Sequence, residues 1–598
     1  MTYLSKSPKS SDTPERPLVL LESFLSGEFP ASYSFEGMEK EIVAKSKEDV
    51  FPAFTKIEAA VASGKHVAGF IAYEAANAFN PHYPIRESSS GMPLLWFGIF
   101  SERRSCGRRM DNLHACDYRL SSSSMDIEKS CYIDAVGNIR DAIADGKTYQ
   151  VNFSLRKRFN VSGDFFGLYR NICRNQPASF CAWLDTGSDL VLSASPELFF
   201  SLKENILTMK PMKGTAGRMP LLEDDCRQRL LLPLNPKERA ENLMIVDMVR
   251  NDLGMIAENG SVNVSSLFDV ETYPTLHQMT STVKARIPSG TDFFSIFKAL
   301  FPSASVTGAP KKSAMEMISA LEDEPRSVYC GAIGYFSPGP EAVFSVAIRT
   351  LAVKKATGEG VAGIGSGVTW DSDPCAEFSE CLNKSDFIFR DSTPFKLVES
   401  IRYDRYGYHM LERHLRRLSG SADYFGICAD MKMIDEELSL FAVNLTGDNK
   451  VRIAVDQSGG FEINSTVIPD SISEDAITVA RLSRNRVDSS DIFLYHKSTR
   501  RTLYNKEMQL HPECYDILFL NEREELTEGT FNNIVLSIGG ELFTPPVRSG
   551  LLPGVLRAVL IESGEVAEKI LTVEDIYKAE KIWLINSVRG WRECRFLF

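Results

Sequence analysis

The first candidate for chemistry in this chain is a lysine whose backbone is expected to hold it in place rather than leave it mobile in solvent. Residues 211–215 read PMKGT and place Lys213 between a proline and a Gly-Thr pair. Proline fixes the backbone and glycine permits close approach of another segment, so a bent, closely packed backbone is expected. Such a lysine can act as a nucleophile when its pKa is lowered. For this segment alone, an ordinary surface lysine is the favoured interpretation.

Two predicted helices carry carboxylates that could share one metal ion. Residues 237–252 include Glu241, and residues 371–384 include Glu377 and Glu380. Carboxylates from two helices can hold a hard cation while water and substrate oxygens complete its shell, an arrangement that suits Mg²⁺. Two exposed faces with ordinary salt bridges remain the favoured interpretation of either helix alone.

Two further segments of the first half could bind an anion. Residues 360–368 read GVAGIGSGV, and their glycines allow backbone N–H groups to approach a ligand closely. Arg349 ends the apolar run 346–348, a position that suits a bidentate contact with a carboxylate. A common glycine-rich turn and an arginine at a sheet edge are the alternatives.

The second half contains the parts of a cofactor site. Lys497 follows the short apolar run 492–494, and Glu528 lies in a polar turn. Residues 550–557 read GLLPGVLR, a turn that opens a helix whose N-terminal N–H groups could bind phosphate. A reactive lysine, an acidic partner for a pyridinium nitrogen and a phosphate cup are what pyridoxal phosphate (PLP) needs. Singly, these features are also explained by a surface lysine, a hairpin turn and a helix cap.

The elements that must position these residues are both helical and extended. The apolar spacing predicts strands and helices in both halves. The expected strands are 189–194, 198–202, 342–353 and 397–403, and the expected helices are 127–145, 236–250, 311–321 and 411–425. No fixed-period repeat relates the halves. The sequence therefore predicts an α+β protein with a disordered lead-in at 1–17 and two different domains, 18–390 and 391–598.

Composition narrows the possible partners and location. The chain has 598 residues and a net charge of -12, which argues against nucleic acid or an anionic membrane as the main partner. No apolar run approaches the roughly 20 residues needed to span a bilayer. The polar N-terminus lacks the apolar region of a secretory signal, and the 12 cysteines show no zinc-binding spacing. A cytoplasmic protein is expected.

Taken together and in order, the segments of the first half resemble the chorismate-utilising enzymes. That family includes anthranilate synthase component I, isochorismate synthase and aminodeoxychorismate synthase component I. The resemblance covers residues 20–388 and also includes YQVNF at 149–153, SPE at 195–197, RNDLG at 250–254, TGAPK at 307–311 and YCGAIGY at 329–335. It implies a chorismate-binding fold of layered antiparallel sheets with helices, and chorismate as the substrate.

The resemblance also assigns roles to residues. It implies that Glu241 and Glu380 bind Mg²⁺, with Glu377 beside them, and that the metal holds one chorismate carboxylate. It implies a second carboxylate site made of Tyr329, Arg349, the backbone of Gly367 and Lys384.

A further carboxyl, Glu197, matches the family's general acid, which helps the 4-hydroxyl leave and must be protonated. The chain departs from the family at its histidine, because the aligned position is Gln278 and His277 lies one place before it.

The resemblance gives Lys213 a specific role. This position is alanine in anthranilate synthases and lysine in the aminodeoxychorismate branch. There the amine is thought to attack the chorismate ring and expel the 4-hydroxyl, after which ammonia displaces the lysine. A free lysine has a pKa of about 10.4, so burial or neighbouring cations must lower it. Lys210 and Arg218 are candidate neighbours.

In order, the segments of the second half resemble class IV PLP enzymes, and in particular aminodeoxychorismate lyase. The resemblance covers residues 395–598 and implies that Lys497 bonds the cofactor and that Glu528 contacts its ring nitrogen. The phosphate would be held by Arg417 and the backbone of Thr530, Phe531, Val555 and Leu556. Lyases and aminotransferases share these residues, so this half alone does not decide the reaction. Family habit suggests a homodimer.

The two resemblances combine into a two-step reaction. The first half would make 4-amino-4-deoxychorismate, and the second would eliminate pyruvate to leave 4-aminobenzoate, a folate precursor. No Gly-x-Cys-x-Gly nucleophile segment is present, so a separate glutamine amidotransferase or free ammonia is expected as nitrogen source. One alternative is anthranilate synthesis with an unrelated aminotransferase attached. Another is a tryptophan- or chorismate-sensing regulator, since residues 20–23 (LLES) resemble an effector-pocket segment.

Overall fold

The computed structural model describes residues 18–24, 31–86, 91–106, 117–390, 393–469 and 478–597. The chain divides into two compact units, of which the second comprises Gly217–Leu230 together with everything from Thr393 onward. The domain limits expected from the sequence, 18–390 and 391–598, place Gly217–Leu230 in the first half; by its contacts it groups with the second. The expected disordered lead-in at 1–17 lies outside the described residues.

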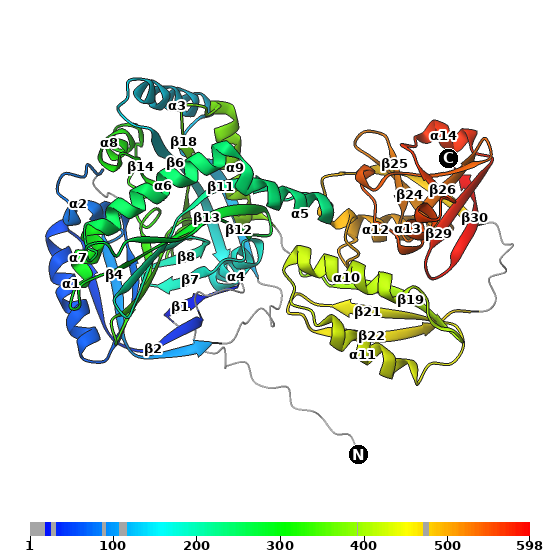
Figure 1. The fold of residues 1–598 in the computed structure, drawn as a ribbon, viewed down its shortest axis with the longest axis horizontal. Helices are drawn as coiled ribbons and strands as arrows, with labels where there is room; N and C mark the ends of the chain where they lie inside the picture. Colours follow the sequence, from blue (N-terminus) through cyan, green and yellow to red (C-terminus); the bar gives the residue numbers. More distant parts are fainter. Residues whose placement is uncertain are drawn as a thin grey trace, which may run out of the picture. The chain divides into compact units, whose positions relative to one another are not determined.

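The first unit is built on one long antiparallel path of strands (Figure 1). Each neighbouring pair in the path is hydrogen-bonded in antiparallel register. In order, the strands are β5 (Tyr118–Met125), β6 (Gln150–Gly163), β18 (Glu359–Val368), β17 (Thr350–Lys354), β8 (Asp189–Ser195), β7 (Phe180–Asp185), β1 (Val19–Glu22), β2 (Ser32–Ala44), β4 (Leu95–Cys106), β3 (His66–Ile71), β15 (Ala332–Ser337), β16 (Glu341–Val346), β9 (Leu198–Lys203), β10 (Ile206–Lys210), β13 (Leu276–Arg286) and β12 (Asn263–Thr272). Two short strands join this sheet at its edges, β11 (Met212–Gly217) on β13 and β14 (Gly308–Ala309) on β6.

Helices cover this sheet and fix its shape. A cluster of phenylalanines holds α1 (Lys47–Ala62), α2 (Ala76–Phe79) and α7 (Phe293–Leu300) against the strands. Elsewhere α3 (Lys129–Ala144), α4 (Phe165–Asn175) and α8 (Lys311–Leu321) pack on the sheet. Two helices matter for the site: α6 (Pro236–Gly254) packs on β13 and α9 (Pro374–Phe389) on β18. Within the described ranges, no helix is both long and apolar enough to cross a membrane.

Most of the expected elements occur where the sequence placed them. The helices predicted at 311–321 and 411–425 have those limits, and α6 begins at Pro236, where the Asn235 side chain accepts hydrogen bonds from the first backbone N–H groups. The prediction of a single strand at 342–353 is wrong. The segment is split into β16 and β17, because Arg349 takes a left-handed conformation with φ of 53° and the chain changes its sheet partners there.

The second unit contains two sheets. The smaller has the order β20 (Gly407–Tyr408), β19 (Leu397–Asp404), β21 (Asn449–Val455) and β22 (Phe461–Val467). Two helices, α10 (Leu411–Phe425) and α11 (Met431–Ala442), pack on the face of this sheet that carries Ile401, Val451 and Ile453.

The larger sheet of the second unit is mixed, because β23 runs parallel to both of its neighbours. Its order is β25 (Leu526–Gly529), β24 (Asp516–Asn521), β23 (Thr478–Val487), β30 (Gly590–Leu597), β29 (Lys581–Asn586), β26 (Asn533–Ile538), β27 (Glu541–Thr544) and β28 (Ala567–Glu568). The accompanying helices are α12 (Thr502–Leu510), α13 (Val555–Glu562) and α14 (Val573–Lys578). The strands and helices of the two units form the α+β architecture that the sequence predicts.

A helix from the first half of the sequence belongs to this second unit. It is α5 (Leu222–Leu231), preceded by Arg218. The Arg218 guanidinium donates to both carboxylate oxygens of Asp225 at 2.9 Å and to the Tyr424 carbonyl at 2.9 Å, and it lies 4.0 Å from the centre of the Tyr424 ring. Leu221 packs into the apolar cluster that includes Tyr495. These contacts attach α5 firmly to the second unit.

Candidate active sites

The backbone around Lys213 is anchored to α6. The Asn242 side chain donates to the Lys213 carbonyl at 2.8 Å and accepts from the Ser281 hydroxyl at 2.6 Å. Gly214 has a φ of 98°, which bends the segment as its sequence predicts, and the N–H of Thr215 donates to Glu238 at 3.1 Å. The same helix carries Glu241, so one element positions both the lysine and a predicted metal ligand.

The amine of Lys213 lies against the backbone of Gly367. A Cβ atom added at Gly367 would stand 2.6 Å from Lys213 Nζ and 2.4 Å from Gln150 Nε2, closer than real Cβ contacts. Position 367 must therefore be glycine for these side chains to keep their places. Sequence reasoning assigned no role to Gln150, although the residue is 1% exposed and its Oε1 has no hydrogen-bond partner among the described residues. The sequence feature that could have identified Gln150 is a polar residue at the first position of a buried strand.

Substitution of Gly367 tests this packing. We expect Gly367→Ala to displace the Lys213 amine and lower amination of chorismate about 10²-fold, since small misplacements of reacting groups have effects of that size. Gly254→Ala is the matched control, because its added Cβ meets no atom within 4 Å apart from its chain neighbours and the backbone of its own helix. Product formation by the two variants is the measurement. Equal activities would show that the contact at Gly367 does not position Lys213.

The surroundings of Lys213 favour its uncharged amine. Burial lowers its pKa, and the positive charge of Lys384 lowers it further, while the negative charges of Glu241, Glu197 and Glu380 oppose the shift. The flanking cations expected to contribute are engaged elsewhere, because Lys210 pairs with Glu271 and Arg218 with Asp225. The cation that acts on Lys213 comes instead from α9.

Glu197 has the burial that a general acid requires. It lies between β8 and β9 and is 4% exposed. Burial raises its pKa to about 7, against the effects of a hydrogen bond with Ser305 and the charge of Lys213. Near neutral pH this carboxyl is therefore protonated in a large fraction of molecules.

The three predicted metal ligands lie on the two helices that flank the site. Burial raises the pKa of Glu241, with contributions from the negative charges of Glu238 and Glu377. Burial would also raise the pKa of Glu380, but Lys384, at 2.5 Å, outweighs it and the pKa is lowered. Glu377 accepts a hydrogen bond from Ser372 at 2.8 Å.

Within the described ranges, no three acidic, histidine or cysteine side chains converge closely enough to form a metal cage. The donor chemistry nevertheless fits a hard cation held by few protein ligands, because a cation would relieve the repulsion between the Glu241 and Glu377 carboxylates.

The four predicted substrate-binding residues are brought together along β18 and α9. A Cβ at Gly363 would stand 2.0 Å from the Tyr329 ring, so this tyrosine packs directly on the glycine strand. Lys384 Nζ donates to the Gly365 carbonyl at 3.0 Å, and Arg349 donates to the Lys384 carbonyl at 3.1 Å. Because residues alternate along a strand, Gly363, Gly365 and Gly367 share one face.

The alternation of β13 separates His277 from Gln278. His277 is 1% exposed and its Nδ1 lies 3.0 Å from the Thr272 hydroxyl. Gln278 Nε2 donates to the Gly214 carbonyl at 2.8 Å, next to Lys213. Gln278 thus contacts the backbone next to Lys213, and His277 contacts the side chain of Thr272 on the neighbouring strand.

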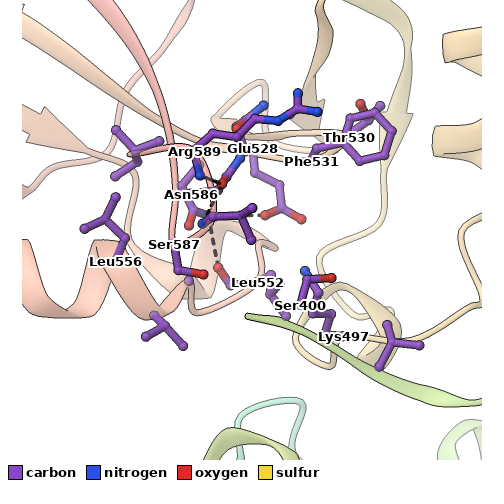
Figure 2. A pocket seen from close by; sticks show the side chains of 18 of the residues that line it. Ser400, Lys497, Glu528, Thr530, Phe531, Leu552, Leu556, Asn586, Ser587 and Arg589 are labelled. Atoms are coloured by element: carbon purple, nitrogen blue, oxygen red, sulfur yellow. Dashed lines mark hydrogen bonds between the residues drawn. The ribbon is translucent and has the colours of Figure 1, made fainter. Parts of the chain in front are cut away.

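The second unit contains a cavity of about 700 Å³. Figure 2 shows Lys497 and Ser400 at its lower border and Glu528 and Arg589 above. All of the cofactor residues expected from the sequence line it: Arg417, Lys497, Glu528, Thr530, Phe531, Val555 and Leu556. Ser587, which was not among the predicted site residues, also borders it (Figure 2).

The pKa values of the two titratable residues Lys497 and Glu528 both lie closer to 7 than usual. Lys497 is tied to β19, because its carbonyl accepts from the Val398 N–H at 2.9 Å. Burial lowers its pKa to about 8, assisted by the charge of Arg417. Burial raises the pKa of Glu528 to about 7, and Asn533 donates to its carboxylate at 3.2 Å. A cationic ring N–H beside Glu528 would stabilise its charged form.

Arg417 is held in place by a buried carboxylate. Its guanidinium donates to both oxygens of Glu399 at 2.8 and 2.7 Å, and to the Pro553 carbonyl at 3.0 Å. Burial alone would raise the pKa of Glu399, but Arg417 and His414 outweigh it and hold that pKa far below its usual range. Pro553 lies two residues before the start of α13, so Arg417 lies at a helix N-terminus, where a phosphate would fit. The lysine, the acid and this cup together suit PLP.

Comparison with known proteins covers both units. A family model described as chorismate binding enzyme matches residues 22–390, and one described as amino-transferase class IV matches residues 396–596.

Two curated relatives match the first unit. Aminodeoxychorismate synthase component 1 of Klebsiella aerogenes is 38% identical over 271 residues, which is 45% of this chain and 60% of that protein. Anthranilate synthase component 1 of Streptomyces coelicolor is 34% identical over 280 residues, 47% of this chain and 54% of that protein. The chain thus spans little more than half the length of these relatives.

A solved structure shares the fold of the first unit. Anthranilate synthase component I from Streptococcus pneumoniae superposes with a TM-score of 0.53 at 25% identity, over 62% of this chain and 94% of that chain. Relatives of both reaction types are therefore similar to this chain, and the residues at the site must distinguish between them.

Proposed function

Because this chain belongs to the family of chorismate binding enzymes, we propose that its first unit aminates chorismate to 4-amino-4-deoxychorismate. We propose further that its second unit eliminates pyruvate from that product to give 4-aminobenzoate. The observation that carries the proposal is the half-buried Lys213, whose lowered pKa and contact with Gly367 suit a nucleophile. The resemblance implies alanine at this position in anthranilate synthases, which favours the amination of chorismate at its 4-position.

Binding of chorismate would precede the chemistry in the first unit. Tyr329, Arg349, Lys384 and the backbone of Gly367 would hold one carboxylate. Glu241, Glu377 and Glu380 would hold Mg²⁺, whose charge would offset that of the other carboxylate. Lys384 is then shared between the carboxylate site and Glu380, to which it is paired at 2.5 Å.

Amination would then take two substitutions. The Lys213 amine forms a C–N bond to the ring while the C–O bond to the 4-hydroxyl breaks, and Glu197 gives its proton to the departing oxygen, so that water leaves. Ammonia next forms its own C–N bond and the lysine departs with its electron pair. The Glu197 carboxylate takes the surplus proton from the new ammonium group, which restores both side chains.

The acid role of Glu197 predicts a pH dependence. Its protonated form is the active one, so amination is expected to fall as the pH rises through about 7. Rates measured at a fixed concentration of uncharged ammonia would isolate this effect. Glu197→Gln should lower the rate about 10²-fold or more and abolish the decline. Glu316→Gln, an exposed change on α8, serves as control, and an unchanged profile in Glu197→Gln would contradict the role.

In the second unit, the residues described above would bind and orient the cofactor. Arg417 and the N-terminus of α13 would hold its phosphate, and Glu528 would keep its ring nitrogen protonated. PLP, when bound, supplies an electron sink for bond cleavage near the amine-bearing carbon. Lys497 would hold the cofactor, and its pKa of about 8 suits its amine to accept and return a proton.

The decisive experiment supplies the purified chain with chorismate, ammonia, Mg²⁺ and PLP and identifies the aromatic product. We expect 4-aminobenzoate and pyruvate. Anthranilate would contradict the proposal and support the alternative of an anthranilate synthase joined to an unrelated aminotransferase. With glutamine in place of ammonia and no added protein, we expect no amination, because a separate amidotransferase would supply the nitrogen. Robust amination from glutamine would refute the requirement for a separate amidotransferase.

A further inference from the structure

Besides Arg417, Lys497 and Arg501, whose guanidinium donates to the Thr530 carbonyl, three cations line the cavity of the second unit. Lys450 and Arg452 lie on β21, and Arg589 lies in the turn between β29 and β30. Among the described lining residues, Glu528 is the one carboxylate. Within the described ranges none of the three forms an ion pair, whereas their neighbour Arg402 pairs with Asp448 at 2.5 Å. The cavity therefore has a surplus of positive charge on one side.

This surplus lies along the cavity-facing side of the smaller sheet, whereas Arg417 reaches the cavity from the helices on the other side. Ser400 on β19 stands opposite Arg452 on β21, and Glu399 stands opposite Ile453. Because side chains alternate along strands, Arg452 and Ser400 share the cavity face. Arg417 is bound to Glu399, whose side chain is on the opposite face with the helices. A phosphate at Arg417 and α13 would leave Lys450, Arg452 and Arg589 unsatisfied.

The three cations also repel one another. Burial lowers the pKa of Lys450, and the charges of Arg589 and Arg452 lower it further. The Arg589 guanidinium donates to the Tyr515 hydroxyl at 3.1 Å, which fixes its position without neutralising it. A bound anion would remove this repulsion and form charge-assisted hydrogen bonds.

The spacing of the strands gives the distance between Lys497 and the three cations. The Lys497 backbone is hydrogen-bonded to β19, and β19 is hydrogen-bonded to β21. Two strand spacings across the sheet and two residues along it place the Arg452 backbone about 12 Å from that of Lys497. A cyclic amine bound at Lys497 would therefore direct the far side of its ring toward the cations. In 4-amino-4-deoxychorismate, the ring carboxylate lies across the ring from the amine.

We propose that Lys450, Arg452 and Arg589 form a carboxylate-binding site that selects cyclic dicarboxylate amines over amino acids with one carboxylate. The assignment of 4-amino-4-deoxychorismate as the ligand rests on the lyase function proposed above. The site would hold the ring carboxylate and so orient the amine toward Lys497. These cations then determine specificity, while Lys497 performs the chemistry.

The test uses the full chain loaded with PLP and the separate variants Lys450→Met, Arg452→Met and Arg589→Met. With purified 4-amino-4-deoxychorismate, each variant should raise KM about tenfold or more and change kcat little, because each removes a charge-assisted contact. Cofactor absorbance should be unchanged. Lys396→Met is the control, since Lys396 pairs with Glu462 on the exposed part of the same sheet.

A second measurement separates this proposal from the lyase function. Isophthalate and benzoate are compared as ligands of the holoenzyme by the change in cofactor spectrum, and wild type should prefer the dicarboxylate. Loss of that preference in the variants supports the site even if wild type forms no 4-aminobenzoate, a result that would overturn the lyase function alone. KM values and preferences like those of Lys396→Met would overturn the site. Loss of the cofactor from the variants, or a changed oligomeric state with an unaltered KM, would also overturn the proposed site.

Discussion

Replacement of Lys213 by alanine is expected to lower formation of 4-amino-4-deoxychorismate from chorismate and ammonia about 10²-fold or more. The amine is the proposed nucleophile, and it lies against Gly367. The substituted site retains Glu197 and the carboxylate-binding residues, so the residual reaction should be stalled or shifted toward anthranilate. Chromatographic identification of the aromatic products measures both outcomes.

The control for this substitution comes from the same segment. Lys210→Ala removes a lysine three residues earlier that pairs with Glu271, and it should leave the product unchanged. Absorbance of bound PLP should be the same in both variants, which shows that the second unit is intact. If Lys213→Ala makes 4-aminobenzoate at the wild-type rate, Lys213 is not the nucleophile.

Replacement of Lys497 by alanine is expected to abolish pyruvate release while amination continues. The variant loses both the amine that bonds PLP and the group that moves the proton, so the absorbance band of covalently bound cofactor should disappear. With chorismate and ammonia, 4-amino-4-deoxychorismate should accumulate, since the residues of the first unit are untouched. Pyruvate release falls by at least about 10³-fold on this account.

The matched control is Lys506→Ala, which removes an exposed lysine from α12. It should retain the absorbance band and the lyase rate. Pyruvate release by Lys497→Ala near the wild-type rate would exclude this lysine from the reaction. If no 4-amino-4-deoxychorismate accumulates and chorismate is not consumed, the first step would instead depend on Lys497.

Much of the fold was predictable because local signals and tertiary contacts agree. The helix at 311–321 and the basic helix at 411–425 have apolar faces that both the sequence pattern and the packed core require. The strand expected at 342–353 failed because periodicity does not reveal a left-handed residue. The backbone of Arg349 turns there between two pairs of partner strands.

The site was less predictable, since it depends on contacts between residues far apart in sequence. The chain order alone suggested that Lys210 and Arg218 act on Lys213, yet the charge that does so belongs to Lys384. Gln150 drew no attention, because only the fold brings it to Gly367. Likewise, Lys450 and Arg452 look like ordinary outward residues of an alternating strand until the strand is placed beside Lys497.

The attachment of α5 to the second unit means that the boundary between the two catalytic parts does not fall at one point of the sequence. A cut at 390/391 leaves Arg218 without the Tyr424 carbonyl and strips Leu222 from α10, where it lies over Gly420. That glycine, unfavourable inside a helix, makes room for a side chain that is about 200 positions away in the gene. Recombination that exchanged either half for a homologue would therefore have to carry α5 across as well.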